Sequence, residues 1–302
     1  MKLFAGIDGG QSSTIALVAD ERRRVLGRGI AGPCDYIGQS PDSVRFARAL
    51  ESAVSAALRA ADLSPDSEFA AVVAGISGYE GKIVGAEPRL KSKRVHYLHD
   101  AKIAHAACFD DGPGIIVIAG TGSVALGRNA QGEEVAVGGW GFLFGDEGSG
   151  FAIARAAIAH AMQAQDVGIE SALARRATEF FALPDLRAIA HEFYVNRIER
   201  SKLASFATIV FELNDRGEEA ATRIVQGAAR ALADLASTCA QRLRLKPPEV
   251  DVSLSGGTFA SESFARLVSA SIRDRLPHSR VAKAREEPAT GALLLAYKEA
   301  AG

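Results

Sequence analysis

The chain opens with short apolar runs separated by small polar residues. Residues 3–20, LFAGIDGGQSSTIALVAD, predict an apolar strand, a Gly/Ser turn and a second strand. Residues 24–32 predict a third strand of the same meander. Residues 43–63 then carry apolar positions at helical spacing, which predicts a helix with Ser43 as its N-cap.

The same pattern occurs twice along the chain. After apolar runs at 69–78 and 94–100, which have the character of buried strands, residues 114–139 predict a second three-strand meander with a Gly-rich first turn. Aligned on the first strand, Phe4–Leu17 falls opposite Ile115–Leu126. This internal repeat predicts two similar α/β halves that face each other.

The remainder of the chain is predominantly helical. A strand and a Gly-Gly turn within 250–261, followed by a helix from Ser261, interrupt the helical pattern. Apolar faces at helical spacing predict helices over 148–164, 168–182, 186–198, 218–243 and 287–300.

Composition narrows the class of protein. The 302 residues have room for two domains, and 48% hydrophobic and 24% charged residues are ordinary for a globular protein. A net charge of −1 gives no electrostatic reason to expect a nucleic-acid or membrane partner. The three cysteines form no C-x-x-C pair, which argues against a zinc or iron–sulfur site. We therefore expect a cytoplasmic protein with reduced thiols and without a signal peptide.

The stretch 114–129, GIIVIAGTGSVALGRN, raises the question of a dinucleotide site. In that motif the glycines must open a helix, whose N-terminus holds the pyrophosphate. Here the turn is followed by VALGRN, which is β-prone, and no G-x-x-x-x-G-K-[ST] sequence occurs either. The turn is instead typical of a strand–turn–strand loop whose backbone amides form an anion nest.

Two such loops occur, one in each half. They suggest a pair of phosphate grips that hold a triphosphate from both sides. Asp8 precedes the first loop, where a carboxylate can hold hydrated Mg²⁺ against a polyphosphate; the alternative is that Asp8 caps a hairpin turn. The first loop comprises Gly9, Gly10, Gln11, Ser12, Ser13 and Thr14, and the second Gly120, Thr121, Gly122 and Ser123.

These two loops, together with further motifs, resemble those of the N-acetylglucosamine kinase group and the related BadF/BadG-type ATPases of the sugar kinase/actin superfamily. The resemblance rests on ordered motifs that run from residue 6 to residue 296. They are GIDGGQSST, HDAKIAHAA, IAGTGS, GGWGFLFGDEGSG, LSGG and GALLLA.

The resemblance implies an α/β fold with two ribonuclease H-like (actin-like ATPase) domains flanking an ATP/sugar cleft. The first domain is expected over 1–118, with the C-terminal helix 288–302 packing back on it. The second is expected over 119–287, with helical insertions.

The resemblance also implies the roles of individual residues. Asp100 matches the catalytic base, and from the sequence it ends a strand and opens a helix, although it could also be a plain N-cap. Gly256 and Gly257 match the adenosine motif, and the implied cofactors are ATP and Mg²⁺. The implied sugar-site residues are Asp35, Ser77, Asp100, Gly122, Gly139, Trp140 and Asp146.

Some of these residues have other interpretations, and two positions depart from the family pattern. The segment around Asp146 could be a plain helix-start loop, and Trp140 could be a core residue. Asp35 stands where relatives commonly have an asparagine, which suggests a preference for a free 2-amino group. Gln11 stands where a third glycine is usual, and ATP binding is expected to persist.

These features predict an ATP-dependent kinase that phosphorylates the 6-hydroxyl of N-acetylglucosamine or a close relative. A glucosamine kinase is the near alternative. A partner-coupled ATPase without a sugar substrate is another, against which the missing cluster cysteines count, and a sugar-sensing regulator is a third. The expected partner is an amino sugar, with no nucleic acid or membrane, and apolar helix faces suggest a homodimer.

Overall fold

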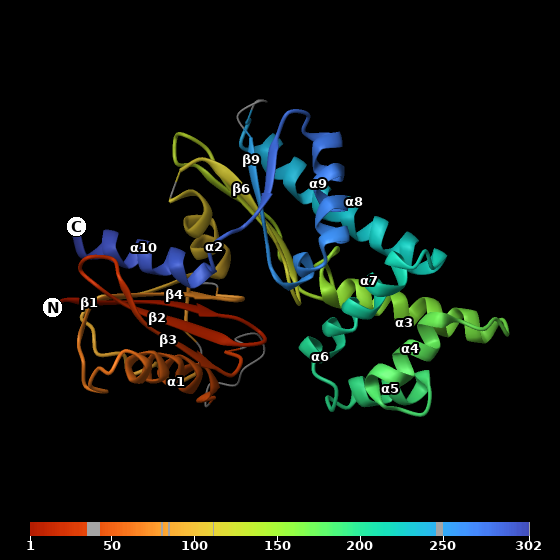
Figure 1. Cartoon of the computed structure of the whole chain (residues 1–302), viewed down its shortest axis with the longest axis horizontal. Coiled ribbons are helices and arrows are strands. Elements are labelled where there is room, and N and C mark those ends of the chain that lie inside the picture. Colours follow the sequence, from red (N-terminus) through yellow and green to blue (C-terminus); the bar gives the residue numbers. More distant parts are fainter. Residues whose placement is uncertain (35–42, 80, 84, 111, 246–249, 302) are drawn as a thin grey trace. The chain divides into compact units, whose positions relative to one another are not determined.

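The computed structural model describes residues 1–34, 43–79, 81–83, 85–110, 112–245 and 250–301. The chain forms two compact units, Met1–Pro113 with Ala284–Gly302, and Gly114–Lys283 (Figure 1). The boundaries expected from the sequence, 118 and 288, differ because the strand that begins at Gly114 belongs to the second sheet. Within the described residues, no helix is long and apolar enough to cross a membrane.

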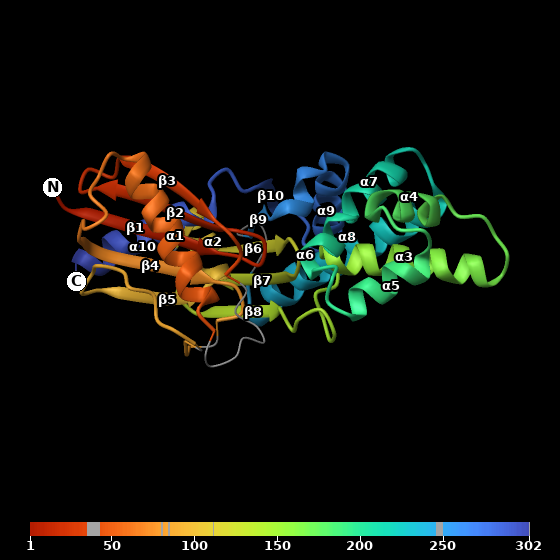
Figure 2. The ribbon, with the colours of Figure 1, turned by 90° about the horizontal axis from the view of Figure 1, so that it is seen from below.

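The first unit is built on a five-stranded mixed sheet in the order β3-β2-β1-β4-β5. The first three strands form the predicted antiparallel meander, and the last two run parallel to β1 (Figure 2). The strands are β1 (Leu3–Gly9), β2 (Thr14–Asp20), β3 (Val25–Ala31), β4 (Phe69–Ile76) and β5 (Val95–His99).

Helices cover both faces of this sheet (Figure 1). On one face, α1 (Arg45–Ala60) packs on β3 and β2; on the other, α2 (Asp100–Phe109) and α10 (Pro288–Ala301) pack on β1 and β4. The alternation of side chains along β1 explains this: Ile7 lies in the core under α1, and Phe4 lies in the core under α10.

The contact between α10 and β1 depends on a glycine. A side chain at Gly6 would overlap the backbone of Ala289 and Leu293. The predicted C-terminal helix therefore lies directly against the central strand of the first sheet.

The predicted cap of α1 is wrong by one residue. The N-cap is Val44, without a side-chain cap, and Ser43 Oγ accepts a hydrogen bond from the amide of Arg45 at 3.3 Å. The serine hydroxyl bonds two residues ahead, so it stabilises the turn before the helix rather than the first helical turn.

The second unit repeats the topology of the first. Its strand order, β10-β9-β6-β7-β8, has the same antiparallel meander on one side and parallel strands on the other. The internal repeat is thus confirmed. The strands are β6 (Gly114–Ala119), β7 (Ser123–Arg128), β8 (Glu134–Gly138), β9 (Asp251–Ser255) and β10 (Arg280–Lys283).

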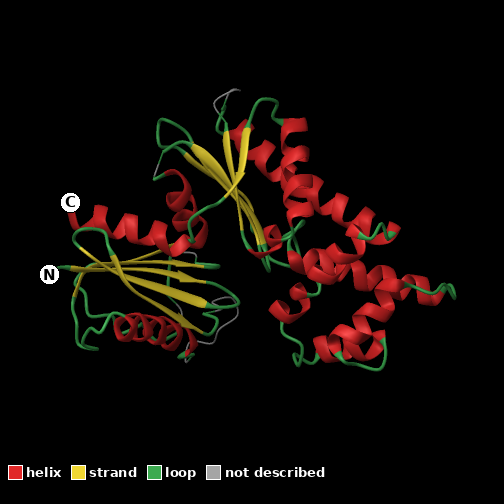
Figure 3. Cartoon of the chain, in the orientation of Figure 1, coloured by secondary structure: helices red, strands yellow, loops and turns green. Residues whose placement is uncertain are grey.

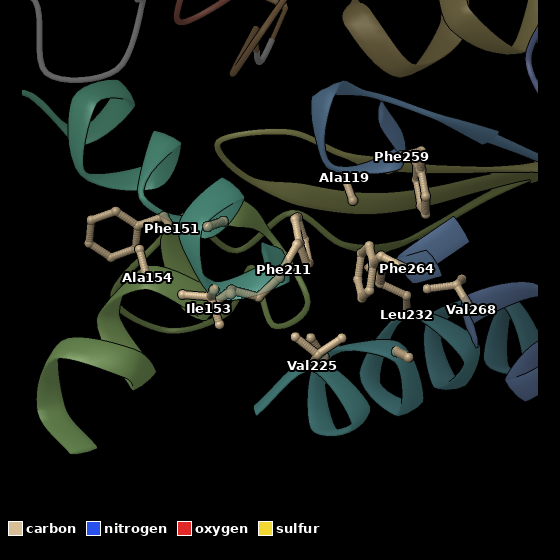
Figure 4. Close-up of a cluster of buried hydrophobic side chains, with 14 of the residues drawn as sticks. Ala119, Phe151, Ile153, Ala154, Phe211, Val225, Leu232, Phe259, Phe264 and Val268 are labelled. Carbon is tan, nitrogen blue, oxygen red and sulfur yellow. The ribbon is translucent and has the colours of Figure 1, made fainter. Parts of the chain in front are cut away.

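Helices make up most of the second unit (Figure 3). Their apolar faces pack around Phe151, Phe211, Phe259 and Phe264 in the core drawn in Figure 4. The sequence did not predict α6, α7, β10 or η1, which are short elements. The helices are α3 (Gly150–Asp166), α4 (Ala172–Phe181), α5 (Leu186–Tyr194), α6 (Arg200–Ser205), α7 (Ala207–Asp215), α8 (Glu219–Arg242), η1 (Gly257–Ala260) and α9 (Glu262–Arg275).

Candidate active site

The first glycine loop joins β1 to β2 and is held mainly by backbone hydrogen bonds. The Gly10 amide donates to the Ser13 carbonyl at 2.9 Å, and the Cys34 amide donates to the Gly10 carbonyl at 3.1 Å. The Ser77 amide donates to the Gly9 carbonyl at 2.9 Å, so this loop is tied to the end of β4. Ser12, in the same loop, is exposed.

Side chains add two further contacts to this loop. Thr14 is buried, and its hydroxyl donates to the Gly32 carbonyl at 2.9 Å. Gln11 Nε2 lies 3.5 Å from Ser77 Oγ, so the residue that replaces the usual glycine reaches a predicted sugar-site residue. The structure thus brings Gln11 and Ser77 together.

Three carboxyl groups converge near the carboxyl ends of the parallel strands. The pairing register places Gly9, Ile76 and His99 at one level across β1, β4 and β5, so Asp8 and Asp100 are carried at the same edge of the sheet. Burial, reinforced by the charges of Asp100 and Glu287, raises the pKa of Asp8 to about 7. Asp8 and Asp100 are therefore close enough to interact electrostatically.

Glu287 was not predicted from the sequence. It lies immediately before α10, and its carboxylate forms a bidentate pair with Arg28, with Nε–Oε1 and Nη2–Oε2 distances of 3.1 and 3.0 Å. Nothing in the local sequence marks Glu287, because its proximity to Asp8 arises only when the C-terminal helix packs on β1.

Asp8 fits a magnesium ligand in charge and position. A cation would relieve the repulsion among these carboxyl groups, and Mg²⁺ typically takes one or two carboxylates together with waters and phosphate oxygens. Among the described residues, no group of three or more His, Cys, Asp or Glu side chains has the arrangement of an all-protein metal site. Asp8 would hold the ion, and the phosphates would supply further oxygens.

Asp100 is the first residue of α2, directly after β5, as the sequence predicted. It is not the N-cap: His99 takes that role, with its Nδ1 accepting a hydrogen bond from the Ala101 amide at 3.2 Å. The same Nδ1 lies 2.9 Å from Asp100 Oδ1. The position of the carboxylate is therefore set by the helix start and by the neighbouring imidazole.

The second glycine loop joins β6 to β7 and is held by side chains as well as by the backbone. Asp146 Oδ1 accepts a hydrogen bond from the Ser123 amide at 3.2 Å, and Ser123 Oγ donates to the Glu147 carbonyl at 2.8 Å. A Cβ at Gly122 would lie 2.9 Å from Asp146 Oδ2. Burial raises the pKa of Asp146, and the Ser123 amide opposes that shift.

Asp146 lies in the loop before α3, at a positive φ of 61°. The loop is also a helix start, as the alternative interpretation had it, but the N-cap is Ser149, which accepts from the Ala152 amide at 3.1 Å. The Gly150 amide donates to the Gly120 carbonyl at 2.8 Å. The start of α3 and the second glycine loop are thus one hydrogen-bonded structure.

The Gly-Gly turn after β9 packs against the same loop. A side chain at Gly256 would overlap the backbone of Ala119, and its φ of 110° also favours glycine. Thr258 Oγ1 donates to the Ala119 carbonyl at 2.8 Å. Gly257, in contrast, faces open space. The predicted adenosine motif therefore adjoins the second glycine loop.

The GGWGFLFG segment is exposed. Trp140 is 77% exposed, which excludes the alternative of a core tryptophan, and Leu143 and Phe144 are exposed beside it. The Gly139 amide donates to the Ser123 carbonyl at 3.0 Å, so this segment starts at the second glycine loop. Asp35 lies outside the described residues.

The comparisons with known proteins agree with this architecture. Residues 5–296 match the BadF/BadG/BcrA/BcrD ATPase family. The chain belongs to this family. Within the curated relatives, the N-acetylmuramic acid/N-acetylglucosamine kinase of Clostridium acetobutylicum is 27% identical over 320 residues, covering 99% of each chain. The N-acetyl-D-glucosamine kinase of Dictyostelium discoideum is 26% identical, covering 98% of each chain.

Solved structures share the fold of this family member. A candidate N-acetylglucosamine kinase from Chromobacterium violaceum superposes with a TM-score of 0.81 at 23% identity, covering 98% of this chain and 99% of that one. A ROK family glucokinase from Streptomyces griseus, solved with glucose and AMPPNP, has a TM-score of 0.64 at 18% identity, covering 98% and 99%. The expected fold class, two actin-like α/β domains of the sugar kinase type, is confirmed.

Proposed function

We propose that this protein is an ATP-dependent kinase that transfers the γ-phosphate of ATP to the 6-hydroxyl of N-acetylglucosamine or a close relative. The observation that carries the proposal is the pair of carboxyl groups, Asp8 and Asp100, at the carboxyl ends of parallel strands beside a glycine loop. Names of relatives that match almost the whole chain support the sugar as acceptor.

In the proposed reaction Asp100 is the general base. Its carboxylate takes the proton of the sugar hydroxyl, the hydroxyl oxygen forms a bond to the γ-phosphorus, and the bond from that phosphorus to the bridging oxygen breaks. The bonding electrons leave with ADP. Asp100 is the first residue of α2, so its backbone is fixed at the junction of β5 and the helix.

The glycine loops are the proposed phosphate-binding elements. The first loop offers backbone amides and the hydroxyl of exposed Ser12, together with Gln11, and the second offers the backbone around Gly120 and Thr121. Mg²⁺ at Asp8 would neutralise charge on the phosphates. Gly257, in open space beside the second loop, is the proposed neighbour of the adenosine.

The proposed sugar contacts include Asp146 and Trp140. Asp146 can accept hydrogen bonds from vicinal hydroxyls through the oxygen that is not bonded to Ser123. The exposed Trp140 offers an apolar face to a sugar ring. The remaining proposed contacts are Asp35, Ser77, Gly122 and Gly139.

The test is ADP release with Mg²⁺-ATP and a panel of sugars: N-acetylglucosamine, glucosamine, N-acetylmannosamine, N-acetylmuramic acid and glucose. Phosphate on the 6-hydroxyl is checked by ³¹P NMR of the product. Sugar-dependent release is the expected result. Steady hydrolysis indifferent to every sugar would overturn the kinase proposal in favour of a partner-coupled ATPase.

The same panel tests the acceptor preference. If the Asp35 carboxylate accepts a hydrogen bond from a free 2-amino group, Asp35→Asn shifts the ratio of kcat/KM from glucosamine toward N-acetylglucosamine, by about tenfold. An unchanged ratio would remove Asp35 from the specificity argument.

We also propose that the activity depends on Mg²⁺, that the protein forms a homodimer and that it is cytoplasmic. Titration of activity with EDTA and Mg²⁺ tests the first. Sedimentation velocity of the purified chain tests the second, and cell fractionation tests the third.

A further inference from the structure

His99 makes two contacts through one nitrogen. Its Nδ1 accepts from the Ala101 amide at 3.2 Å, and it lies 2.9 Å from Asp100 Oδ1. A bond from the amide requires a lone pair on Nδ1, whereas a bond to the carboxylate requires a proton on Nδ1. The two contacts therefore belong to different protonation or tautomeric states of one imidazole.

We propose that His99 is a positioning residue for Asp100 and a proton-operated switch on it: an Nδ1–H holds the carboxylate, and a bare Nδ1 releases it and caps α2. The inference rests on the proposed function, in which Asp100 is the base. With His99 protonated, Asp100 Oδ1 is engaged and a cation lies beside the carboxylate. Both effects weaken Asp100 as a proton acceptor.

The surroundings of His99 support the switch. The hydrogen bond to Asp100 raises the pKa of His99, while burial and the charge of Lys102 oppose the rise. The net effect raises the pKa of His99 from its ordinary value, and histidine protonation can affect a reaction near neutral pH. Asp100 and Lys102 are the charged groups that act on it, and the neighbouring strand β4 carries no ionisable side chain.

The geometry also explains why a histidine is useful at this position. An N-cap needs only an acceptor, which Asn, Asp or Ser provides without titrating. His96, on the same strand, is an internal comparison: its Nε2 lies 3.3 Å from Glu299 Oε2 of α10, and both side chains are exposed. His99 combines a helix cap with a carboxylate contact, whereas His96 contacts a carboxylate from a position within the strand.

The test compares pH profiles of kcat for the wild type, His99→Asn, His99→Ala and the control His96→Asn. In the wild type and in His96→Asn, kcat falls by about tenfold per pH unit below the His99 pKa. Asparagine can accept from the Ala101 amide without titrating, so His99→Asn displaces this acid limb to lower pH. Alanine removes both the cap and the titrating imidazole, so His99→Ala lowers kcat above the His99 pKa, leaves KM for ATP the same and lacks the acid limb.

Two results would overturn the inference. One is a His99→Asn profile that coincides with that of the wild type. The other comes from NMR titration of the His99 ring protons: the pKa of His99 must fall in Asp100→Asn, and an unchanged value would show that the two side chains are not coupled.

The NMR readout needs no turnover. If the wild type phosphorylates no sugar, the proposed function fails, and the NMR titration alone then decides whether His99 and Asp100 form the switch.

Discussion

The two glycine loops occupy the same place in two copies of one topology, yet they are built differently. The last residue pairs of the hairpins are Gly9–Thr14 in β1–β2 and Ala119–Ser123 in β6–β7. At these strand ends the first unit has Asp8 beside Gly9, and the second has Ile118 beside Ala119. At this position the first copy carries an ionisable side chain where the second carries an apolar one.

The carboxylates of the two regions serve different purposes. In the second unit, Asp146 is bonded to the Ser123 amide and holds the loop. In the first unit, Asp8 and Asp100 lie close enough to repel each other, and the loop is held by backbone bonds. The two copies of the topology thus differ in their carboxylates: the first carries two that repel each other, and the second carries one that is hydrogen-bonded to its glycine loop.

Asp100→Asn tests this comparison with the largest expected effect on activity. The variant keeps the shape of the side chain but cannot take a proton, so sugar-dependent ADP release should fall by about 10³-fold while ATP binding remains. Asp110→Asn is the matched control, since Asp110 is the C-cap at the other end of α2 with a φ of 45°, which asparagine tolerates. Equal losses in both variants would refute the assignment of the base.

Asp8→Asn should separate activity from stability. The pKa of Asp8 is raised to about 7, so the folded state binds its proton more tightly than the unfolded state does. This group therefore favours folding at low pH, and that contribution is lost as pH rises through about 7.

An asparagine at position 8 does not ionise, so the Asp8→Asn variant does not lose stability as the pH rises through about 7. At pH 8 and without Mg²⁺, Asp8→Asn should be more stable by on the order of 1 kcal/mol, while activity falls by about 10²-fold. Thermal melts at pH 5 and pH 8, with activity assays, check both. A variant less stable than the wild type at pH 8 would contradict the electrostatic argument.

Substitutions at Gly256 and Gly257 test how the Gly-Gly turn after β9 is held. Gly256→Ala combines a positive φ with overlap on Ala119, so it should destabilise the protein by about 3 kcal/mol. Gly257→Ala meets open space and should leave the melting temperature unchanged, raising KM for ATP by about tenfold if the adenosine lies there. Equal melting temperatures in the two variants would show that the turn is not held as described.

Gln11→Gly restores the glycine usual in the family and should have the smallest effect. It removes the long 3.5 Å contact with Ser77, so we expect a change of about twofold to threefold in KM for ATP or sugar. A loss as large as that of Asp8→Asn would mean that Gln11 belongs to the charge chemistry of the first unit.

The sequence predicted much of this structure because its strongest signals are local. Strand alternation, helical spacing and two Gly-rich turns are readable within windows of ten to twenty residues, and they predicted both meanders, the repeat and most helices. Short elements such as α6 and β10 carry too few apolar positions to show a period. The predicted N-cap of α1 was also wrong, since the N-cap is Val44 and not its neighbour Ser43.

The candidate site was predictable only where a motif is contiguous. The loops, Asp100 and Asp146 could be named from their motifs. Glu287 could not, since its charge reaches Asp8 only through the packing of the C-terminal helix. The two contacts of His99 Nδ1, with the Ala101 amide and with Asp100 Oδ1, depend on side-chain rotamers at the β5–α2 junction. A pattern of residue types does not predict rotamers.

The position of α10 also has a consequence for the order of synthesis. The core on one face of the first sheet includes four residues that follow the whole second unit along the chain, Ala289, Ala292, Leu293 and Ala296. The ribosome therefore completes the contiguous second unit, Gly114–Lys283, before it makes α10 of the first unit. In a nascent chain this face of β1 lacks α10 until residues 288–301 have been made, so a premature stop before Pro288 would leave a mature second unit attached to an unfinished first one.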